Sequence, residues 1–477
     1  MEALSLSLEP AVFLSALFVI LSVTYYILQR KRGQNNKYPP SYKGWIPWIG
    51  CAFEFGVAPL GFIDKKRREL GPVFTFHVAG ERLTFLTEAE DFHHFFQSPN
   101  VDFQRAVQDP VQNVASVSEE SFMQNHTKIH DMLKGRLASS RLNEVTPHLL
   151  QQFKERIHTV FGSEGEGELF NLVRKTMYAG VINNLFGDSI LPTDDAEEFE
   201  KLCKHFIVFD EQFEYGARLP PMFIRDWSTA KQYLLSKFKA VVSKLENQET
   251  TKNQTVLQTL FSITDRPHAP NYALLLLWAS LANAVPLTFW TLCLILNNKA
   301  VLQKLQSQIE NTMGNIPEDQ WEFSEEFLKK MPYLRSCVLE AIRLHPVGVI
   351  TRRVMTSFTV RNFVIPEGDM LMVSPFWSHK NPKYFPDPHA FNPDRWKTSD
   401  LEKNIFLDGF IAFGGGRYQC PGRWYAQMEL QMFVALFLHK YKVTLLSDHE
   451  PMPSFKHVVG TQQPSEPFLV SYKTRTQ

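Results

Sequence analysis

Cysteine is scarce in this chain and is not arranged for disulfides. Five cysteines are scattered over 477 residues with no CxxC pair: Cys51, Cys203, Cys293, Cys337 and Cys420. An odd, dispersed set excludes a disulfide-stapled fold and predicts a reducing compartment. A charge bias is also missing, because 50 Lys and Arg balance 50 Asp and Glu. We therefore do not expect nucleic acid as a partner.

One uncharged apolar run stands near the N-terminus, at residues 11–28. Glu2 and Glu9 precede it and Arg30-Lys31-Arg32 follow it. Its length suits a single transmembrane helix, and the positive cluster places the following chain in the cytosol. The alternative, a cleaved signal peptide, is disfavoured because the positive charge follows the apolar run. We predict a membrane anchor over residues 1–32, a proline-rich hinge over 33–50 and a folded body over 51–477.

The body alternates between two kinds of periodicity. Residues 73–78 and 82–86 predict a β-hairpin, and residues 87–331 are mostly helical in pattern. The apolar segment 272–296 predicts a long buried helix, kinked at Pro286. Strands are expected again at 348–355, 358–365 and 370–373, and short strands near the C-terminus. The fold class is therefore mainly α, an α+β body with small sheets.

A glycine-rich loop with one cysteine is the strongest chemical signal. Residues 413–422 read Phe-Gly-Gly-Gly-Arg-Tyr-Gln-Cys-Pro-Gly, and an apolar helix is expected from Trp424 to Leu438. A cysteine just before a helix start lies in the positive end of the helix dipole, which favours a thiolate. Such a thiolate can ligate a haem iron, whereas the alternative reading is a free buried cysteine.

A second signal is Glu340-Ala-Ile-Arg343 in an apolar helix. The three-residue spacing places the two charges on one helix face. On a surface this pair would be a weak ion pair, but the apolar neighbours predict burial, where an arginine needs further partners. Arg395, in the run Phe391-Asn-Pro-Asp-Arg-Trp396, is the candidate that completes a Glu340–Arg343–Arg395 network.

These motifs, in this order, resemble the cytochrome P450 family. The order is ExxR, a strand region, FxPxRW and FxxGxxxCxG, and the resemblance covers essentially the whole chain. It implies the cytochrome P450 fold, haem b, and Cys420 as the axial ligand of the haem iron. Phe413, Gly416 and Gly422 would lie against the haem, and Arg352 would pair with a propionate. Glu340, Arg343 and Arg395 would hold the proximal side, as a structural role.

The sequence departs from the family pattern at three places. Tyr418 stands where a basic residue usually reaches a propionate, and the usual Trp-x-x-x-Arg pair is absent, with His126, His130 or Lys134 as replacements. Val285 and Pro286 stand where an acid and an alcohol usually deliver protons. Asn283 is the remaining candidate catalytic side chain; the alternative is that it satisfies a carbonyl freed by Pro286.

Within the family, the central segment is similar to sterol 7α- and 12α-hydroxylases and to prostacyclin synthase. The resemblance implies a monooxygenase of an oxysterol in cholesterol and bile acid metabolism, with the 7α position of 24-hydroxycholesterol expected. It also implies O₂, electrons from NADPH through cytochrome P450 reductase, and a single-pass endoplasmic reticulum membrane protein with a cytosolic catalytic domain. Expected substrate contacts are Trp278, Ala282, Asn283, Val285, Val349, Ile350, Val458 and Val459.

Two alternatives remain open on the sequence. A haem-thiolate isomerase or dehydratase of a lipid peroxide would need no reductase, and the missing acid–alcohol pair favours it. A non-catalytic sterol-binding protein would require a haem loop that has lost its ligand, whereas Cys420 is present.

Overall fold

The computed structural model describes residues 16–17, 20, 23–24, 37–245, 254–346, 348–397, 409–454 and 459–475. Most of the predicted anchor, residues 1–32, lies outside the described residues. The described residues within it, at 16–17, 20 and 23–24, are helical. The chain forms two compact units: Met1–Ala106 with Ile350–Val373, and Val107–Val349 with Ser374–Gln477.

The first unit contains a six-stranded sheet in the order β1-β2-β3-β9-β6-β4. The predicted hairpin is confirmed, because β2 and β3 pair antiparallel with Phe74 opposite Phe85. β3 pairs parallel with β9, and β6 pairs antiparallel with β9. The strands of this unit are β1 (Ser41–Tyr42), β2 (Val73–Val78), β3 (Glu81–Leu86), β4 (Val101–Asp102), β6 (Ile350–Val354), β7 (Phe358–Val360), β8 (Phe363–Ile365) and β9 (Met370–Val373).

The first unit differs from the sequence prediction at two places. Residues 358–365 form a small hairpin of β7 and β8 rather than one strand, with Arg361 at φ 53° in the turn. The second half of the predicted hinge joins the sheet, since β1 pairs parallel with β2 and Gly50 bridges to Val78. The helices here are α2 (Ala52–Val57), α3 (Pro59–Leu70) and α4 (Phe92–Phe96).

The second unit is mostly helical, as the periodicity predicts. It includes α6 (Glu119–Arg136), α7 (Thr146–Phe161), α8 (Leu169–Phe186), α9 (Ala196–Glu211), α10 (Phe213–Gly216), α11 (Arg225–Leu245), α12 (Val256–Ile263), α13 (Ala269–Leu281), α14 (Ala284–Asn297), α15 (Lys299–Met313), α16 (Glu325–Lys329), α17 (Pro332–Leu344), α18 (Pro375–Ser378) and α20 (Arg423–Lys440), while α5 (Gln104–Ala115) begins in the first unit.

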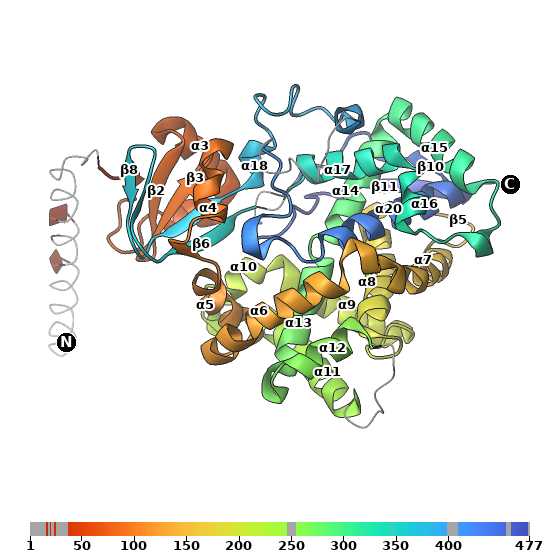
Figure 1. Cartoon of the computed structure of the whole chain (residues 1–477), viewed down its shortest axis with the longest axis horizontal. Helices are drawn as coiled ribbons and strands as arrows, with labels where there is room; N and C mark the ends of the chain where they lie inside the picture. The colour runs from red at the N-terminus through yellow and green to blue at the C-terminus, as the bar shows by residue number, and fades with distance from the viewer. Residues whose placement is uncertain are drawn as a thin grey trace, which may run out of the picture. The chain divides into compact units, whose positions relative to one another are not determined.

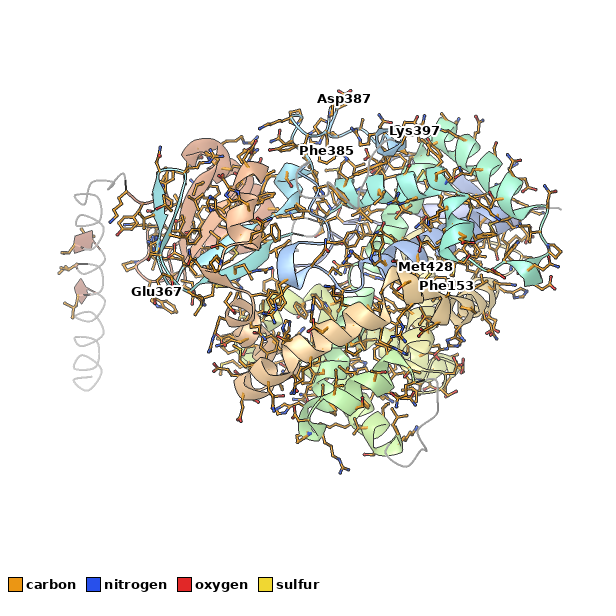
Figure 2. All side chains as sticks on the ribbon, viewed as in Figure 1. Phe153, Glu367, Phe385, Asp387, Lys397 and Met428 are labelled. Carbon is orange, nitrogen blue, oxygen red and sulfur yellow. The ribbon has the colours of Figure 1, made fainter. Side chains whose placement is uncertain are left out.

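The core of the second unit lies where long apolar helices meet. α14 packs on α17 and α20, and these three helices lie together in Figure 1. Side chains fill the space between α7 and α20, where Phe153 of α7 contacts Phe433 of α20 edge-on and Met428 is also buried (Figure 2). α20 is buried along most of its length, so the residues just before it are held on a rigid base.

The second unit also contains a small three-stranded sheet. Its order is β10-β11-β5, with β5 (Glu164–Glu168), β10 (Tyr441–Leu445) and β11 (Leu469–Thr474), and both pairings are antiparallel. The prediction of short strands near the C-terminus is therefore confirmed.

The central apolar segment forms two helices instead of the one that we predicted. α13 ends at Leu281 and α14 begins at Ala284. Proline has no N–H, so Pro286 cannot donate to the carbonyl of Ala282, and the interruption falls at that preceding turn. The described residues contain one helical run apolar and long enough to cross a membrane, Arg266–Asn297, but 83% of its apolar window is buried inside the fold. The burial agrees with the prediction that this segment lies in the core, although the segment forms two helices.

Candidate active site

The loop before α20 is folded around Cys420. The Cys420 N–H donates to the Phe413 carbonyl at 2.9 Å, which closes the segment into a compact turn. Gly414 and Gly416 adopt φ of 64° and 67°, a backbone region that favours glycine. A Cβ added at Gly414 would meet no atom within 4 Å, so open space lies beside the loop.

The electrostatics at Cys420 act in two directions. Burial raises the pKa of the Cys420 thiol, whereas the Gly422 N–H and the Arg423 charge lower it. Both groups belong to the start of α20, whose N-terminus favours negative charge. The other four cysteines are fully buried, while Cys420 is only half-buried. It is therefore the cysteine most accessible to a ligand.

Two histidines of α6 lie against the cysteine loop. The His130 Nε2–H donates to the Gln419 carbonyl at 3.1 Å, next to Cys420. Its ring also lies edge-on to Tyr418, and the His126 ring lies 5.4 Å from that of Tyr418. The residue that replaces the usual basic group is thus packed against both predicted histidines. Because its N–H is used by the loop, His130 serves as a link between α6 and the cysteine.

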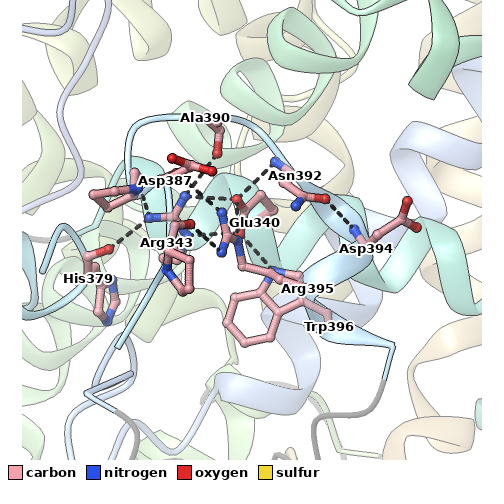
Figure 3. Close-up of polar contacts among 11 residues, drawn as sticks. Glu340, Arg343, His379, Asp387, Ala390, Asn392, Asp394, Arg395 and Trp396 are labelled. Carbon is pink, nitrogen blue, oxygen red and sulfur yellow. Dashed lines mark hydrogen bonds and ion pairs between the residues drawn. The ribbon is translucent and has the colours of Figure 1, made fainter. Parts of the chain in front are cut away.

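Glu340, Arg343 and Arg395 are brought together in one buried network (Figure 3). Arg343 binds both carboxylate oxygens of Glu340, at 2.9 and 2.8 Å, and the Arg395 Nε donates to Glu340 at 2.9 Å. The Trp396 indole N–H and the Asn392 backbone N–H also donate to this carboxylate, at 2.9 and 3.0 Å. Glu340 and Arg343 are both 0% exposed.

The network fixes a loop through its backbone. Arg343 donates to the carbonyls of His379, Pro388 and Ala390, at 2.8, 2.6 and 3.2 Å. Arg395 donates to the carbonyl of Pro386 at 3.0 Å. A buried charge is tolerated when its hydrogen-bonding capacity is filled in this way. The contacts tie α17 to the irregular segment 379–396.

Arg352, the predicted propionate partner, lies in β6 of the first unit. Its guanidinium lies between the rings of Phe95 and Phe103, at 4.8 Å from each centroid, and donates to the Thr351 carbonyl. Ile350 belongs to the same strand, whereas Val349 ends the preceding segment of the second unit. Stacking between two aromatic rings fixes the direction of the Arg352 side chain.

Asn283 lies in the interruption between α13 and α14, and its partner is Thr461. The Asn283 Oδ1 accepts from the Thr461 backbone N–H at 2.9 Å and from the Thr461 hydroxyl at 3.2 Å. Asn283 does not cap α14 with its side chain. The alternative role considered for it, satisfying the carbonyl freed by Pro286, is not what the hydrogen bonds show.

The other predicted substrate contacts fall into distinct environments. Trp278 is half-buried, stacks on Phe213 at 3.8 Å, and uses its indole N–H on Asp210 at 3.0 Å. Ala282 and Val285 are buried around the helix interruption, and Val459 is exposed. Val458 lies outside the described residues.

Sequence reasoning missed Thr461, Gln463 and Asp210. Gln463 Nε2 donates to the Asp210 carboxylate at 2.8 Å, and Trp278 donates to its other oxygen. Thr461 is 178 positions from Asn283, and Gln463 is 253 positions from Asp210. No local pattern links residues so far apart, so a signal for these contacts was not available in the single sequence.

The residues present fit a thiolate-ligated haem. Cys420 is a half-buried residue that offers a thiol, and the Gly422 N–H lies where it can tune sulfur charge. Gly422 also leaves room, because a Cβ there would meet only one atom, at 4.0 Å. Within the described residues no group of His, Cys, Asp and Glu could hold a bare metal ion.

Comparison with known proteins agrees with this geometry. The chain is 42% identical to human 24-hydroxycholesterol 7-alpha-hydroxylase, over 94% of this chain and 96% of that protein. It is 39% identical to the mouse protein of the same name, over 96% and 98%. The solved structure of retinoic acid-bound cyanobacterial CYP120A1 covers 92% of this chain and 99% of that chain, with a TM-score of 0.76 and 18% identity. The family described as Cytochrome P450 matches residues 39–471, across both units. The chain belongs to the cytochrome P450 family.

Proposed function

We propose that this protein is a haem-thiolate monooxygenase that hydroxylates an oxysterol, namely 24-hydroxycholesterol at the 7α position. The observation that carries the chemistry is the Cys420 loop, in which a half-buried cysteine lies just before the start of α20. The observation that carries the substrate is the 42% identity to the human 24-hydroxycholesterol 7-alpha-hydroxylase over nearly the whole of both chains.

Cys420 would ligate the haem iron from the proximal side. A thiolate-bound haem supplies the chemistry that activates O₂. Phe413 and the loop glycines would border the haem, and Arg352 and His126 would pair with its propionates. His130 and the Glu340–Arg343–Arg395 network would hold the protein around Cys420, since both end in hydrogen bonds to neighbouring backbone.

The reaction would place one oxygen atom of O₂ into a C–H bond of the sterol and release the other as water. Two electrons come from NADPH and two protons balance the water, one carried by NADPH and one taken from solvent. Val285 and Pro286 have no side-chain proton to donate. Asn283 can hold a water or an oxygen atom through its Nδ2–H groups, and protons would then reach the site through water.

Cytochrome P450 reductase is the electron donor that we propose. Lys134 and Arg417 are exposed, and Arg417 belongs to the cysteine loop. Basic groups beside the thiolate would steer an acidic flavoprotein to the side of the haem from which electrons enter.

We also propose an endoplasmic reticulum membrane protein with residues 1–32 as its anchor and 33–50 as its hinge. The catalytic domain, residues 51–477, would lie in the cytosol. Trp45 and Trp48, at 75% and 72% exposure, support contact between the hinge region and lipid headgroups. The family match from residue 39 to residue 471 includes residues of both units, which supports assigning residues 51–477 to the catalytic domain.

The test is turnover of an oxysterol panel by the purified full-length holoprotein, with reductase and NADPH and without each. We expect 7α-hydroxylated 24-hydroxycholesterol as the main product, formed only when both are present. A different main product, or no product with any oxysterol, would contradict the proposed substrate.

A haem-thiolate isomerase of a lipid peroxide is the second candidate, favoured by one observation. The first turn of α14 has Val285 and Pro286, which provide no side-chain proton donor, and an isomerase would not need one. In the same assay, a lipid hydroperoxide rearranged rapidly without NADPH or reductase, together with no oxysterol turnover, would establish this alternative.

A further inference from the structure

Asn283 is the one residue between Leu281 and Leu296 that is not fully buried. The accessible residues of α13 that precede it include Leu275 and Ala279, which repeat at four-residue spacing and therefore share a face with Asn283. An otherwise buried pair of helices thus has an accessible stripe that ends at the helix interruption, with Trp278 and Ser280 accessible beside it. A polar side chain at the end of that stripe can reach a bound molecule.

The orientation of the Asn283 carboxamide is set by Thr461. A backbone N–H can only donate, so the atom that accepts from the Thr461 N–H at 2.9 Å must be the oxygen. The Thr461 hydroxyl lies 3.2 Å from the same oxygen. Amide geometry then directs Nδ2 away from Thr461. Asn283 therefore offers hydrogen-bond donors, and no acceptor, on the side of the carboxamide that faces away from Thr461.

The two residues that follow Thr461 are themselves held by hydrogen bonds. The carbonyl of Gln462 accepts from the Trp290 indole N–H at 2.7 Å, and the Gln463 side chain donates to Asp210 of α9 at 2.8 Å. Thr461 and Gln462 are almost completely buried. Three consecutive residues thus bind the interruption, α14 and α9, so the partner of Asn283 is fixed before any ligand arrives.

We propose that Thr461 is a positioning residue, whose hydroxyl acts with its backbone N–H to lock the Asn283 carboxamide, so that Nδ2 donates a hydrogen bond to an acceptor oxygen in the active site; the hydroxyl is the part of this lock that substitution can remove. This oxygen belongs either to a sterol hydroxyl or to dioxygen and its water. The inference rests on the proposed function and assigns a role to the segment 461–463, which had none. It also explains why an asparagine stands at the interruption: an aspartate could accept from Thr461 but could not donate.

The experiment compares full-length holoenzyme variants by three measurements. These are haem content, the affinity for 24-hydroxycholesterol from the substrate-induced change in ferric haem absorbance, and the product formed per NADPH consumed. The variants are Thr461→Val, which removes the hydroxyl at constant volume, Thr461→Ser as its conservative control, Asn283→Ala, Asn283→Asp, and Thr461→Val combined with Asn283→Ala.

We expect Thr461→Val to lose about threefold to tenfold in affinity or in coupling, with haem content unchanged and Thr461→Ser close to wild type. A loss of affinity identifies the sterol hydroxyl as the acceptor, whereas a loss of coupling alone identifies dioxygen or its water. Asn283→Asp should resemble Asn283→Ala. The double variant should be no worse than Asn283→Ala, because the threonine acts through the asparagine.

Three results would overturn the proposal. They are wild-type affinity and coupling in Thr461→Val, wild-type behaviour of Asn283→Asp, or additive losses in the double variant. If the wild-type enzyme neither binds nor oxidises the sterol, the proposed function fails first, and that outcome is separate from any comparison between variants.

Discussion

At the residue level, the peptide before Cys420 is held from both ends. Its carbonyl, on Gln419, accepts from His130 of α6, and its N–H, on Cys420, donates to Phe413. Each bond is ordinary in strength, but together they fix the orientation of the peptide plane from which the cysteine side chain projects. A ligand that must meet a metal within a few tenths of an ångström depends on such support.

We therefore predict that His130→Ala loosens the cysteine loop. The purified variant should lose haem several-fold faster to apomyoglobin and should show a larger fraction of reduced-CO absorbance at the position of protonated or displaced thiolate. His130→Gln keeps a side-chain N–H, so its rate of haem loss and its spectrum should be intermediate between those of wild type and His130→Ala. Haem loss and spectrum identical to wild type in His130→Ala would show that the link has no effect on the ligand.

Glu429 is a second residue with a testable consequence. It lies in α20 at 1% exposure, and its Oε2 has no hydrogen-bond partner in the described part of the chain. Burial raises the pKa of Glu429 well above its usual value. Below about pH 4.3, the pKa of a glutamate in the unfolded chain, Glu429 is protonated in both the folded and the unfolded protein, so it does not make the free energy of unfolding depend on pH. As the pH rises above it, the unfolded state ionises first, and stability falls by about 1.4 kcal/mol per pH unit until the folded pKa is reached.

We predict that Glu429→Gln removes this pH-dependent loss. The melting temperature of the variant relative to wild type should therefore rise as the pH increases from about 5, until the pH reaches the pKa of Glu429 in the folded protein. The matched control is Glu322→Gln, at an exposed position, which should show no such trend. A constant difference between Glu429→Gln and wild type across this range would mean that Glu429 is ionised in the folded protein.

The sequence predicted the residues of local motifs and missed their distant partners. Glu340, Arg343 and Arg395 lie in two short patterns, and their contacts follow from a buried charge that needs acceptors. The Tyr418 departure pointed to His126 and His130, but not to the bond from His130 to the Gln419 carbonyl. That bond depends on how α6 packs on the loop, which no periodicity encodes.

At the level of elements, the Glu340 network holds α17 and the segment 379–396, which precedes the cysteine loop, together through buried hydrogen bonds. Glu340→Ala would leave the Arg343 guanidinium buried without its carboxylate. Breaking such a pair costs about 3–5 kcal/mol, whereas an exposed ion pair is worth at most about 1 kcal/mol. Asp394 lies next to Arg395 in the same segment and forms an exposed ion pair with Lys304 of α15. It therefore provides a matched control.

We predict that Glu340→Ala and Arg395→Ala fail to accumulate as holoprotein, while Asp394→Asn retains wild-type haem content. The measurements are haem per protein after purification and the melting temperature. A folded, fully haem-loaded Glu340→Ala would contradict the structural role of the network.

The interruption between α13 and α14 was predictable from the proline, but the partner of Asn283 was not. Proline at position 286 predicts a disturbed helix, and the disturbance falls one turn earlier, at the carbonyl that loses its donor. That Asn283 of this turn binds Thr461 could not be predicted, because the contact depends on the path of a loop near the C-terminus. Strand positions followed period-two patterns well, but the turn at Arg361 divided one predicted strand into two.

At the level of the whole molecule, we propose that Arg417 of the cysteine loop and Lys134 of α6 act in a complex with the reductase. Lys134 and Arg417 are exposed, so charge reversal there should not alter the fold. We predict that Lys134→Glu and Arg417→Glu slow electron transfer from reductase several-fold at low ionic strength, with the difference shrinking as salt screens the charges. Turnover measured against reductase concentration at two salt concentrations checks this. Equal rates in variants and wild type at low salt would exclude these residues from the docking surface.

Every functional statement about the molecule depends on Cys420 as the haem ligand. The most direct measurement is the reduced-CO difference spectrum of the full-length protein, its Cys420→Ala variant and the control Cys203→Ala, which removes a buried cysteine of α9. We predict the band typical of thiolate-ligated haem in the wild type and in Cys203→Ala, and its loss in Cys420→Ala. The same band in Cys420→Ala, or no such band in the wild type, would contradict the account.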